Sequence, residues 1–206
     1  MKSLTILLIV TNIVSSLAAQ EMKKIANKIY MDSILEVRRD KNTEFMSDKD
    51  SPLADEDKMI FIGLSYFPAN PQYRVTATLT RYDTPFHFNM KTTTDRLPEY
   101  AVFGKAEFKI RGKKMSLNVY QNVELLKKPG YDKYLFIPFS DATNGNETYK
   151  GGRFLDAEIP EGSTMVIDFN LAYNPYCAYN HKYSCPIPPE ENRLPIKIEA
   201  GEKKWR

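Results

Sequence analysis

The chain has 206 residues, of which 42% are hydrophobic and 27% are charged, values typical of a globular protein that buries a core. This length suits one domain or at most two small ones. The formal net charge is only +3 and its Lys and Arg residues are dispersed in pairs, so the composition does not indicate a nucleic-acid partner.

Residues 1–19 have the pattern of a signal peptide. Lys2 supplies a positive start, Leu4–Val14 is largely apolar, and small residues offer cleavage after Ala18 or Ala19. The apolar run is shorter than the roughly 20 residues that a membrane-spanning helix needs. We therefore expect an exported protein of the periplasm or the extracellular space, with no membrane span after cleavage. The alternative is an uncleaved N-terminal anchor.

Residues 20–50 are expected to form one helix packed on the rest of the protein. Between Glu21 and Met46 no Gly or Pro interrupts the chain, and Pro52 disfavours helix beyond Ser51. Apolar side chains recur at helical spacing at Ala26, Tyr30, Ile34, Val37 and Phe45.

After Pro52 the hydrophobic period changes from 3.6 to 2, which predicts strands. The most distinct pair is a hairpin, in which residues 105–110 and 115–119 flank a tight turn at 111–114. In residues 165–169, Met165, Ile167 and Phe169 are expected to face the core. The other predicted strands are 59–64, 73–80, 86–91, 134–139 and 154–156.

Many short alternating strands separated by turns are typical of an antiparallel β-sandwich or small barrel. The sequence shows no βαβ rhythm and no internal repeat. We therefore expect a mainly β protein with one N-terminal α-helix, in which residues 51–206 form a single domain.

Cys177 and Cys185 are the only cysteines, and export favours a disulfide between them. With His181 midway, the same spacing leaves a metal site or a Cys-His nucleophile pair as alternatives. The segment is rich in Pro and Tyr, so a spacing of four does not place the three side chains on one helical face. We expect the disulfide, with no metal and no cofactor.

Polar groups concentrate in the loop after Phe139 and around the strand near Met165. An Asn-Gly turn and a Gly-Gly-Arg segment suggest a loop that presents its side chains at one end of the sheet. The alternative is a loop that hydrogen-bonds to itself, with Asp141 capping backbone N–H groups and Arg153 paired with a carboxylate. The candidate ligand-binding residues are Asp141, Asn144, Glu147, Tyr149, Arg153, Asp168, Asn170, Tyr173 and Asn174.

Several of these segments resemble a known family. They include PFSDATNGNETYKGGRFLD (138–156), DFNLAYNPYCAYN (168–180) and SCPIPPEENRLP (184–195), and together they are similar to the bacterial domain-of-unknown-function family 1684. The resemblance implies no established activity. His181 falls in a gap of the motif, which disfavours the metal and Cys-His alternatives. The resemblance places at motif positions Asp141, Gly145, Glu147, Tyr149, Gly152, Arg153, Asp168, Asn170, Asn174, Cys177 and Cys185.

Three functions compete. The first is a module that binds a small polar ligand through Asp, Glu, Arg, Tyr and Asn side chains, since tyrosines suit stacking and hydrogen bonding. The second is a hydrolase with Asp141 or Glu147 as general base and Arg153 stabilising an oxyanion. The third is a structural protein of the cell envelope. We expect the first.

Overall fold

The computed structural model describes the backbone of residues 2–206 and the side chains of residues 17–206. Met1 and the side chains of the expected apolar run lie outside the described residues. The α-helices and strands are α1 (Lys2–Ser47), α2 (Asp55–Met59), β1 (Arg74–Asn89), β2 (Glu99–Ile110), β3 (Lys113–Asn122), β4 (Tyr134–Phe139), β5 (Arg153–Glu158) and β6 (Thr164–Asp168). Short 3-10 helices cover Pro71–Tyr73, Leu125–Lys127, Phe169–Leu171, Tyr176–Ala178 and Glu190–Asn192.

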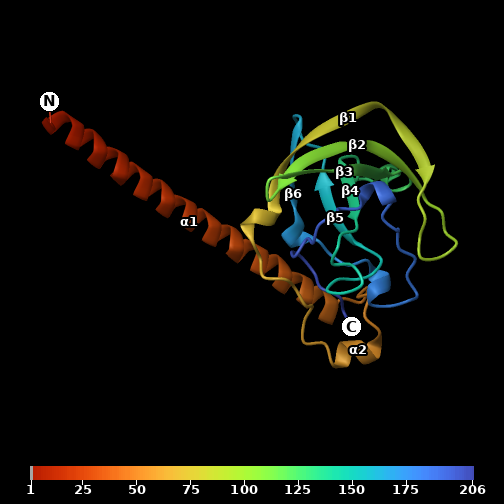
Figure 1. Ribbon diagram of the computed structural model, residues 1–206. Helices are drawn as coiled ribbons and strands as arrows, with labels where there is room; N and C mark the ends of the chain where they lie inside the picture. The colour runs from red at the N-terminus through yellow and green to blue at the C-terminus, as the bar shows by residue number, and fades with distance from the viewer. Residues whose placement is uncertain (1) are drawn as a thin grey trace.

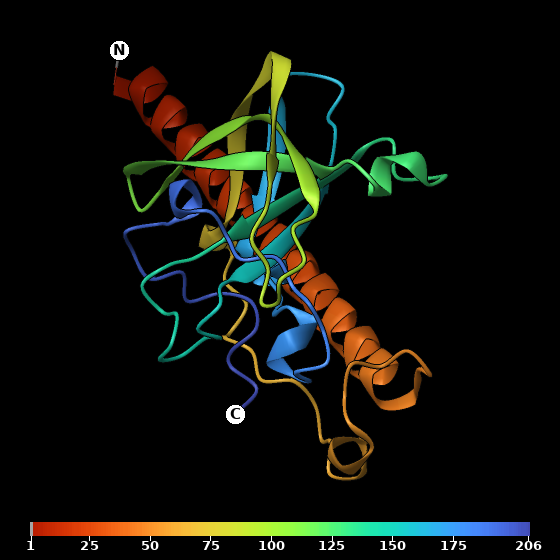
Figure 2. The ribbon, with the colours of Figure 1, turned by 90° about the vertical axis from the view of Figure 1, so that its right-hand side faces the viewer.

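The six strands form one antiparallel sheet in the order β5-β4-β3-β2-β1-β6. The sheet curls into a half-barrel (Figures 1 and 2). The prediction of a mainly β, antiparallel fold with an N-terminal helix is confirmed. The described residues contain no second sheet that would make a sandwich, and β5 and β6 remain edge strands, so the barrel is not closed.

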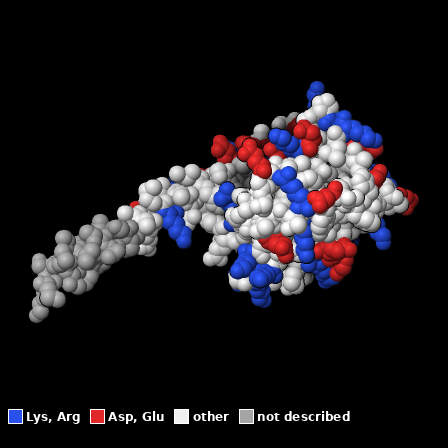
Figure 3. Space-filling model, turned by 90° about the horizontal axis from the view of Figure 1, so that it is seen from above, with Lys and Arg blue, Asp and Glu red and all other residues white. Residues whose placement is uncertain are grey.

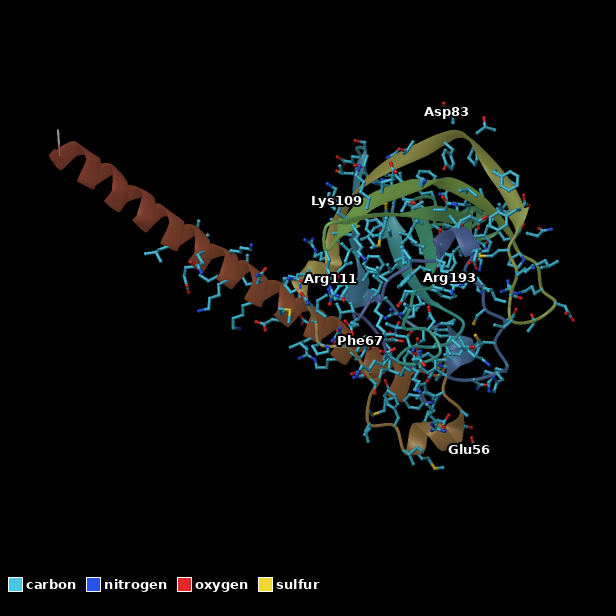
Figure 4. The ribbon with its side chains drawn as sticks, viewed as in Figure 1. Glu56, Phe67, Asp83, Lys109, Arg111 and Arg193 are labelled. Carbon is cyan, nitrogen blue, oxygen red and sulfur yellow. The ribbon has the colours of Figure 1, made fainter. Side chains whose placement is uncertain are left out.

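Two irregularities account for the curvature. The pairing of β1 with β2 shifts between Arg81 and Phe86, and that of β2 with β3 shifts between Val102 and Gly104. Such bulges bend a strand and increase its twist. Gly104 permits the close crossing, because a Cβ there would collide with the carbonyl oxygen of Thr80. The segments predicted as separate strands at 73–80 and 86–91 therefore join in β1, and Asp83 lies at the crest of its bend (Figure 4).

The predicted hairpin is confirmed as β2 and β3. Its two-residue turn is Arg111-Gly112, and both residues have positive φ, 50° and 77°. Turns of this kind match the right-handed twist of the strands they connect. Arg111 adopts an unfavourable conformation, and its guanidinium donates a hydrogen bond of 2.8 Å to the hydroxyl of Tyr73.

The main core lies on one face of the sheet. Met165, Ile167 and Phe169 are buried in it, as predicted. The C-terminal segment closes this core, because Leu194, Ile198 and Ala200 have almost no exposed surface. On the other face of the sheet the buried side chains form a second, largely aromatic cluster. It comprises Met90, Tyr100, Val102, Tyr120, Phe136 and Phe154.

The predicted helix is confirmed, although α1 is longer than expected. Its C-terminal part packs on the domain through Ile34 and Phe45, whereas its N-terminal part projects away (Figure 1). Arg38 donates a hydrogen bond of 2.9 Å to the carbonyl of Phe67, which lies beside the helix (Figure 4). Val37, predicted to face the domain, is half exposed and lines a cavity.

The prediction of a strand at 59–64 is wrong. Helix α2 ends at Met59, and Ile60 and Ile62 point to solvent. No strand of the described chain pairs with this segment, and Phe61 is its one buried side chain, which packs against Phe45 and Trp205.

Within the described residues, no helix has both the length and the apolar character needed to span a bilayer. On the face seen in Figure 3, basic and acidic side chains are interspersed. This face offers no extended surface of a single charge sign.

Candidate functional site

The loop after β4 is held by its own hydrogen bonds. The Asn144 side-chain oxygen accepts from the backbone N–H of Asp141, and its amide donates to the carbonyl of Tyr149 at 2.7 Å. Asp141 Oδ1 accepts from the N–H of Thr143 at 2.8 Å and of Ile198 at 3.1 Å. The alternative of a self-bonded loop, with Asp141 capping backbone groups, is thus what the structure contains.

Arg153 is completely buried and connects this loop to the C-terminal segment. Its Nη2 forms a salt bridge of 2.8 Å with Asp141 and donates to the carbonyl of Ile198 at 2.8 Å. Its Nη1 donates to the carbonyls of Ala200 and Glu202. Burial lowers the pKa of Arg153, and Asp141 offsets part of that effect. Neither side chain of the pair is exposed to solvent, so the pair is not accessible to a ligand.

The other candidates in this loop, Glu147 and Tyr149, are partly exposed. Glu147 pairs with Lys197, and this contact lowers the pKa of the Glu147 carboxyl group. The Tyr149 hydroxyl lies 3.6 Å from the sulfur of Cys177.

Asp168 and Asn170 attach α1 to the sheet. The Tyr30 hydroxyl contacts both carboxylate oxygens of Asp168, at 2.8 and 2.9 Å, and accepts a hydrogen bond of 2.8 Å from the Asn170 amide. Burial and then Asp168 raise the pKa of Tyr30, which therefore remains a donor at neutral pH. The same amide also donates to the carbonyl of Asn70 at 2.9 Å.

Asn174 belongs to a buried network around Glu202. The Asn174 backbone N–H and the Tyr179 hydroxyl both donate to Glu202 Oε2. Lys41 of α1 forms a salt bridge of 2.8 Å with Glu202 Oε1. Glu202 is 1% exposed, so this network fixes α1 against the C-terminal segment rather than facing an open cleft.

Cys177 and Cys185 are free thiols in the structure, and the predicted disulfide is not formed. They lie 3.4 Å apart, whereas a disulfide requires about 2.0 Å between sulfurs. A hydrogen bond from Cys185, followed by one from Tyr149, lowers the pKa of Cys177 to about 6, while contact with Cys177 raises the pKa of Cys185. Within residues 17–206, no group of three His, Cys, Asp or Glu side chains could hold a metal ion, and His181 is exposed.

A cavity of about 820 Å³ lies on the aromatic side of the sheet. Its walls are the C-terminal half of α1, strands β2–β5 and the loop 175–186 that carries Cys185. Tyr173 is the one predicted ligand-binding residue that lines it, whereas Asp168 borders a smaller cavity of about 210 Å³. The aromatic residues that line the large cavity are Phe45, Tyr100, Tyr134, Phe136, Phe154, Tyr173, Tyr176 and Tyr183.

The aromatic side chains of the cavity pack against one another. The rings of Phe136 and Phe154 meet edge to face with centroids 4.8 Å apart. Tyr173 contacts Phe154 at 5.9 Å and Tyr100 contacts Phe136 at 5.8 Å. Edge-to-face rings stabilise such clusters beyond their buried area, so this wall is preformed.

One carboxylate interrupts the aromatic wall. Asp156 Oδ1 accepts hydrogen bonds from the hydroxyls of Tyr134, at 2.6 Å, and Tyr173, at 2.8 Å. Burial and the Asp156 charge raise the pKa of both tyrosines, which therefore remain donors at neutral pH. Asp156 was not among the predicted site residues, because a single Asp in a short strand carries no motif. The available signal was the spacing of two along the strands. Alternate residues of a strand share a face, so Asp156 lies on the side of Phe154, and Tyr134 lies on the side of Phe136.

Comparison with known proteins identifies relatives without an assigned activity. Residues 59–203 match the model of a family described as protein of unknown function, DUF1684. No curated protein matches the chain. A solution structure of an uncharacterised protein from gene locus rrnAC0354 of Haloarcula marismortui is similar, with a TM-score of 0.66 and 34% identity over 86% of this chain and 95% of that one.

Proposed function

The chain belongs to the family of proteins of unknown function DUF1684, and we propose that it is a binding protein that holds a small organic ligand in the cavity between α1 and the sheet. The cavity itself carries this proposal. Its volume of about 820 Å³ lies within the roughly 300–1,000 Å³ of small-molecule sites. Such sites combine a mainly apolar lining with a few polar groups, as this one does.

The polar contacts of the proposed site come from Asp156 and its two tyrosines. Tyr134 and Tyr173 orient the carboxylate through Oδ1. The described residues provide no hydrogen bond to Oδ2, which is therefore available to a donor group of the ligand. This arrangement supports binding rather than hydrolysis, because the general bases considered from the sequence, Asp141 and Glu147, are paired with Arg153 and Lys197 outside the cavity.

We propose further that the protein acts outside the cytoplasm. The support is the pattern of residues 1–19, with a positive start, a short apolar run and small residues at the cleavage site. The cavity is formed by residues from Val37 onward, so cleavage after Ala18 or Ala19 leaves it complete.

A substitution that blocks the cavity tests the proposed function. Purified full-length protein is screened by thermal shift against metabolites, and the hits are quantified by titration calorimetry. Val37→Trp places a large ring in the cavity mouth from an exposed helix position. Leu35→Trp is the matched control, because Leu35 is similarly exposed on the same helix and does not line the cavity.

We expect Val37→Trp to weaken the binding of the hits at least tenfold, because it blocks the cavity. Leu35→Trp should leave the calorimetric affinity within about twofold, because it adds a Trp to α1 outside the cavity. Equal effects of the two variants would place the ligand elsewhere. A screen without any hit would remove the proposal.

A further inference from the structure

The charged side chains around the cavity are not balanced. Lys41 is matched by Glu202 at 2.8 Å, and Glu124 is matched by Lys127 at 2.6 Å. Asp40 has a weak exposed contact with Arg39 at 3.9 Å. Among the described residues Asp156 and Glu44 form no salt bridge, and Lys128 is the one lining cation without an acidic partner. The cavity therefore presents an excess of negative charge.

The rings of the cavity already hold an ammonium group. The Nζ atom of Lys41 lies 4.5 Å from the ring centroid of Tyr173 and 5.8 Å from that of Phe45. Ring faces attract cations through their quadrupole, and the attraction grows when water is excluded. Because Glu202 neutralises Lys41, this side chain does not cancel the charge of Asp156.

We infer that the ligand is an organic cation, an ammonium group carried on an apolar or aromatic body. This inference rests on the proposed function. The ammonium group donates to the free oxygen of Asp156, and the body packs against Phe136 and Phe154. Tyr134 and Tyr173 hold the carboxylate in place by their hydroxyls, so no rearrangement is needed on binding.

An anionic ligand fits the same cavity poorly. It would lie near Asp156 and Glu44, two exposed carboxylates whose negative charges repel an anion. A neutral ligand would fill the aromatic wall but would cover the Asp156 carboxylate from water without compensating its charge. Charge thus discriminates among ligands of equal size.

Three probes of one shape test the inference: phenethylamine, which is cationic at pH 7, neutral 2-phenylethanol and anionic 3-phenylpropionate. Their affinities for the full-length protein are measured by calorimetry and by NMR titration. Asp156→Asn removes the charge, and Glu158→Gln makes the same kind of change two residues further along β5, outside the cavity lining.

We expect phenethylamine to bind at least tenfold more tightly than 2-phenylethanol and the carboxylate to bind most weakly. Asp156→Asn should reduce the affinity for the amine at least tenfold and leave the alcohol within about twofold, while Glu158→Gln changes neither. If the amine and the alcohol bind equally, or if Asp156→Asn leaves the affinity for the amine unchanged, the inference of a cationic ligand is wrong. The cavity then remains a binding site. Binding of none of the three probes at millimolar concentration would overturn both proposals.

Discussion

Arg153 and Asp141 form a salt bridge of 2.8 Å between two side chains that have no solvent exposure. The same guanidinium donates to carbonyls of the C-terminal segment at Ile198, Ala200 and Glu202. A residue at the start of β5 therefore fixes both the loop after β4 and the C-terminal end of the chain. The pair is a structural centre of the fold, separate from the aromatic cavity.

Removing one member of this pair should destabilise the protein strongly. Asp141→Asn leaves the Arg153 charge buried without the counter-charge of its salt bridge, and Arg153→Met leaves Asp141 Oδ2 and the backbone carbonyls without their donor. The expected cost is about 3–5 kcal/mol in the free energy of unfolding. Urea unfolding of each variant, followed by circular dichroism, measures it.

An exposed pair from the same loop is the control. Lys197→Met breaks the contact with Glu147 at the surface, where such pairs contribute about 0–1 kcal/mol. If Asp141→Asn costs no more than Lys197→Met, the assignment of Arg153 as the structural centre is incorrect.

Tyr30 should control the attachment of α1. Tyr30→Phe removes its hydrogen bonds to Asp168 and Asn170 without changing the ring. A hydrogen bond to a charged group contributes about 1.5–3 kcal/mol, so faster amide exchange is expected in α1 around Tyr30. Hydrogen exchange with mass spectrometry checks this. Ser33→Ala, on the same helix but bonded only to the backbone of Tyr30, should leave the exchange unchanged.

Local patterns were sufficient for much of the fold. Strand β4 covers the predicted residues 134–139, and the hairpin of β2 and β3 follows from alternation on both sides of Arg111-Gly112. The prediction that Met165, Ile167 and Phe169 face the core was also correct, because alternation specifies which face of a strand is buried. The apolar run at 59–64 shows the limit of this reasoning, since a strand also needs a neighbour to pair with.

The candidate site was harder to predict because it is made of distant segments. The run Tyr134–Phe139 predicts a strand buried on both faces, and the sequence does not show that one face borders a cavity. That cavity exists because α1 places Val37 and Lys41 opposite β4 and β5. The pairing of Arg153 with a carboxylate could be anticipated, since a buried guanidinium needs one, but its partner depended on the tertiary fold.

The stability of the protein should decrease above pH 10. Burial raises the pKa of Tyr120 from 10.0 to about 12, and raises the pKa values of Tyr134, Tyr173 and Tyr179 as well. An unfolded tyrosine releases its proton near pH 10 while the folded one retains it. The stabilisation is therefore complete below about pH 10 and is lost as the pH rises toward the folded pKa.

Urea unfolding between about pH 8 and pH 11.5 measures this loss. One buried tyrosine contributes a slope of about 1.4 kcal/mol per pH unit above pH 10. Tyr120→Phe should reduce the slope by about that amount and leave the curve below about pH 9 parallel to that of the parent protein. An unchanged slope would show that Tyr120 ionises in the folded state.

Cleavage after Ala18 or Ala19 should leave the folded domain intact. Residues 17–29 of α1 are exposed, and its contacts with the domain begin at Tyr30 and continue through Ile34 and Phe45. Cleavage after Ala18 gives a chain that begins at Ala19, and cleavage after Ala19 gives one that begins at Gln20. Intact-mass analysis of protein from the cell envelope should find one of these two starts. A species that still begins at Met1 would contradict the export proposal.

The cleaved chain should also be as stable as the full-length protein. We expect their free energies of unfolding to agree within about 0.5 kcal/mol, because no described side chain among residues 17–19 is buried. Urea unfolding of the two purified forms, under the same conditions, makes the comparison. A marked loss of stability on cleavage would show that the projecting part of α1 contributes to holding the domain together, and the boundary between a removable segment and the folded protein would then have to lie before Ala18.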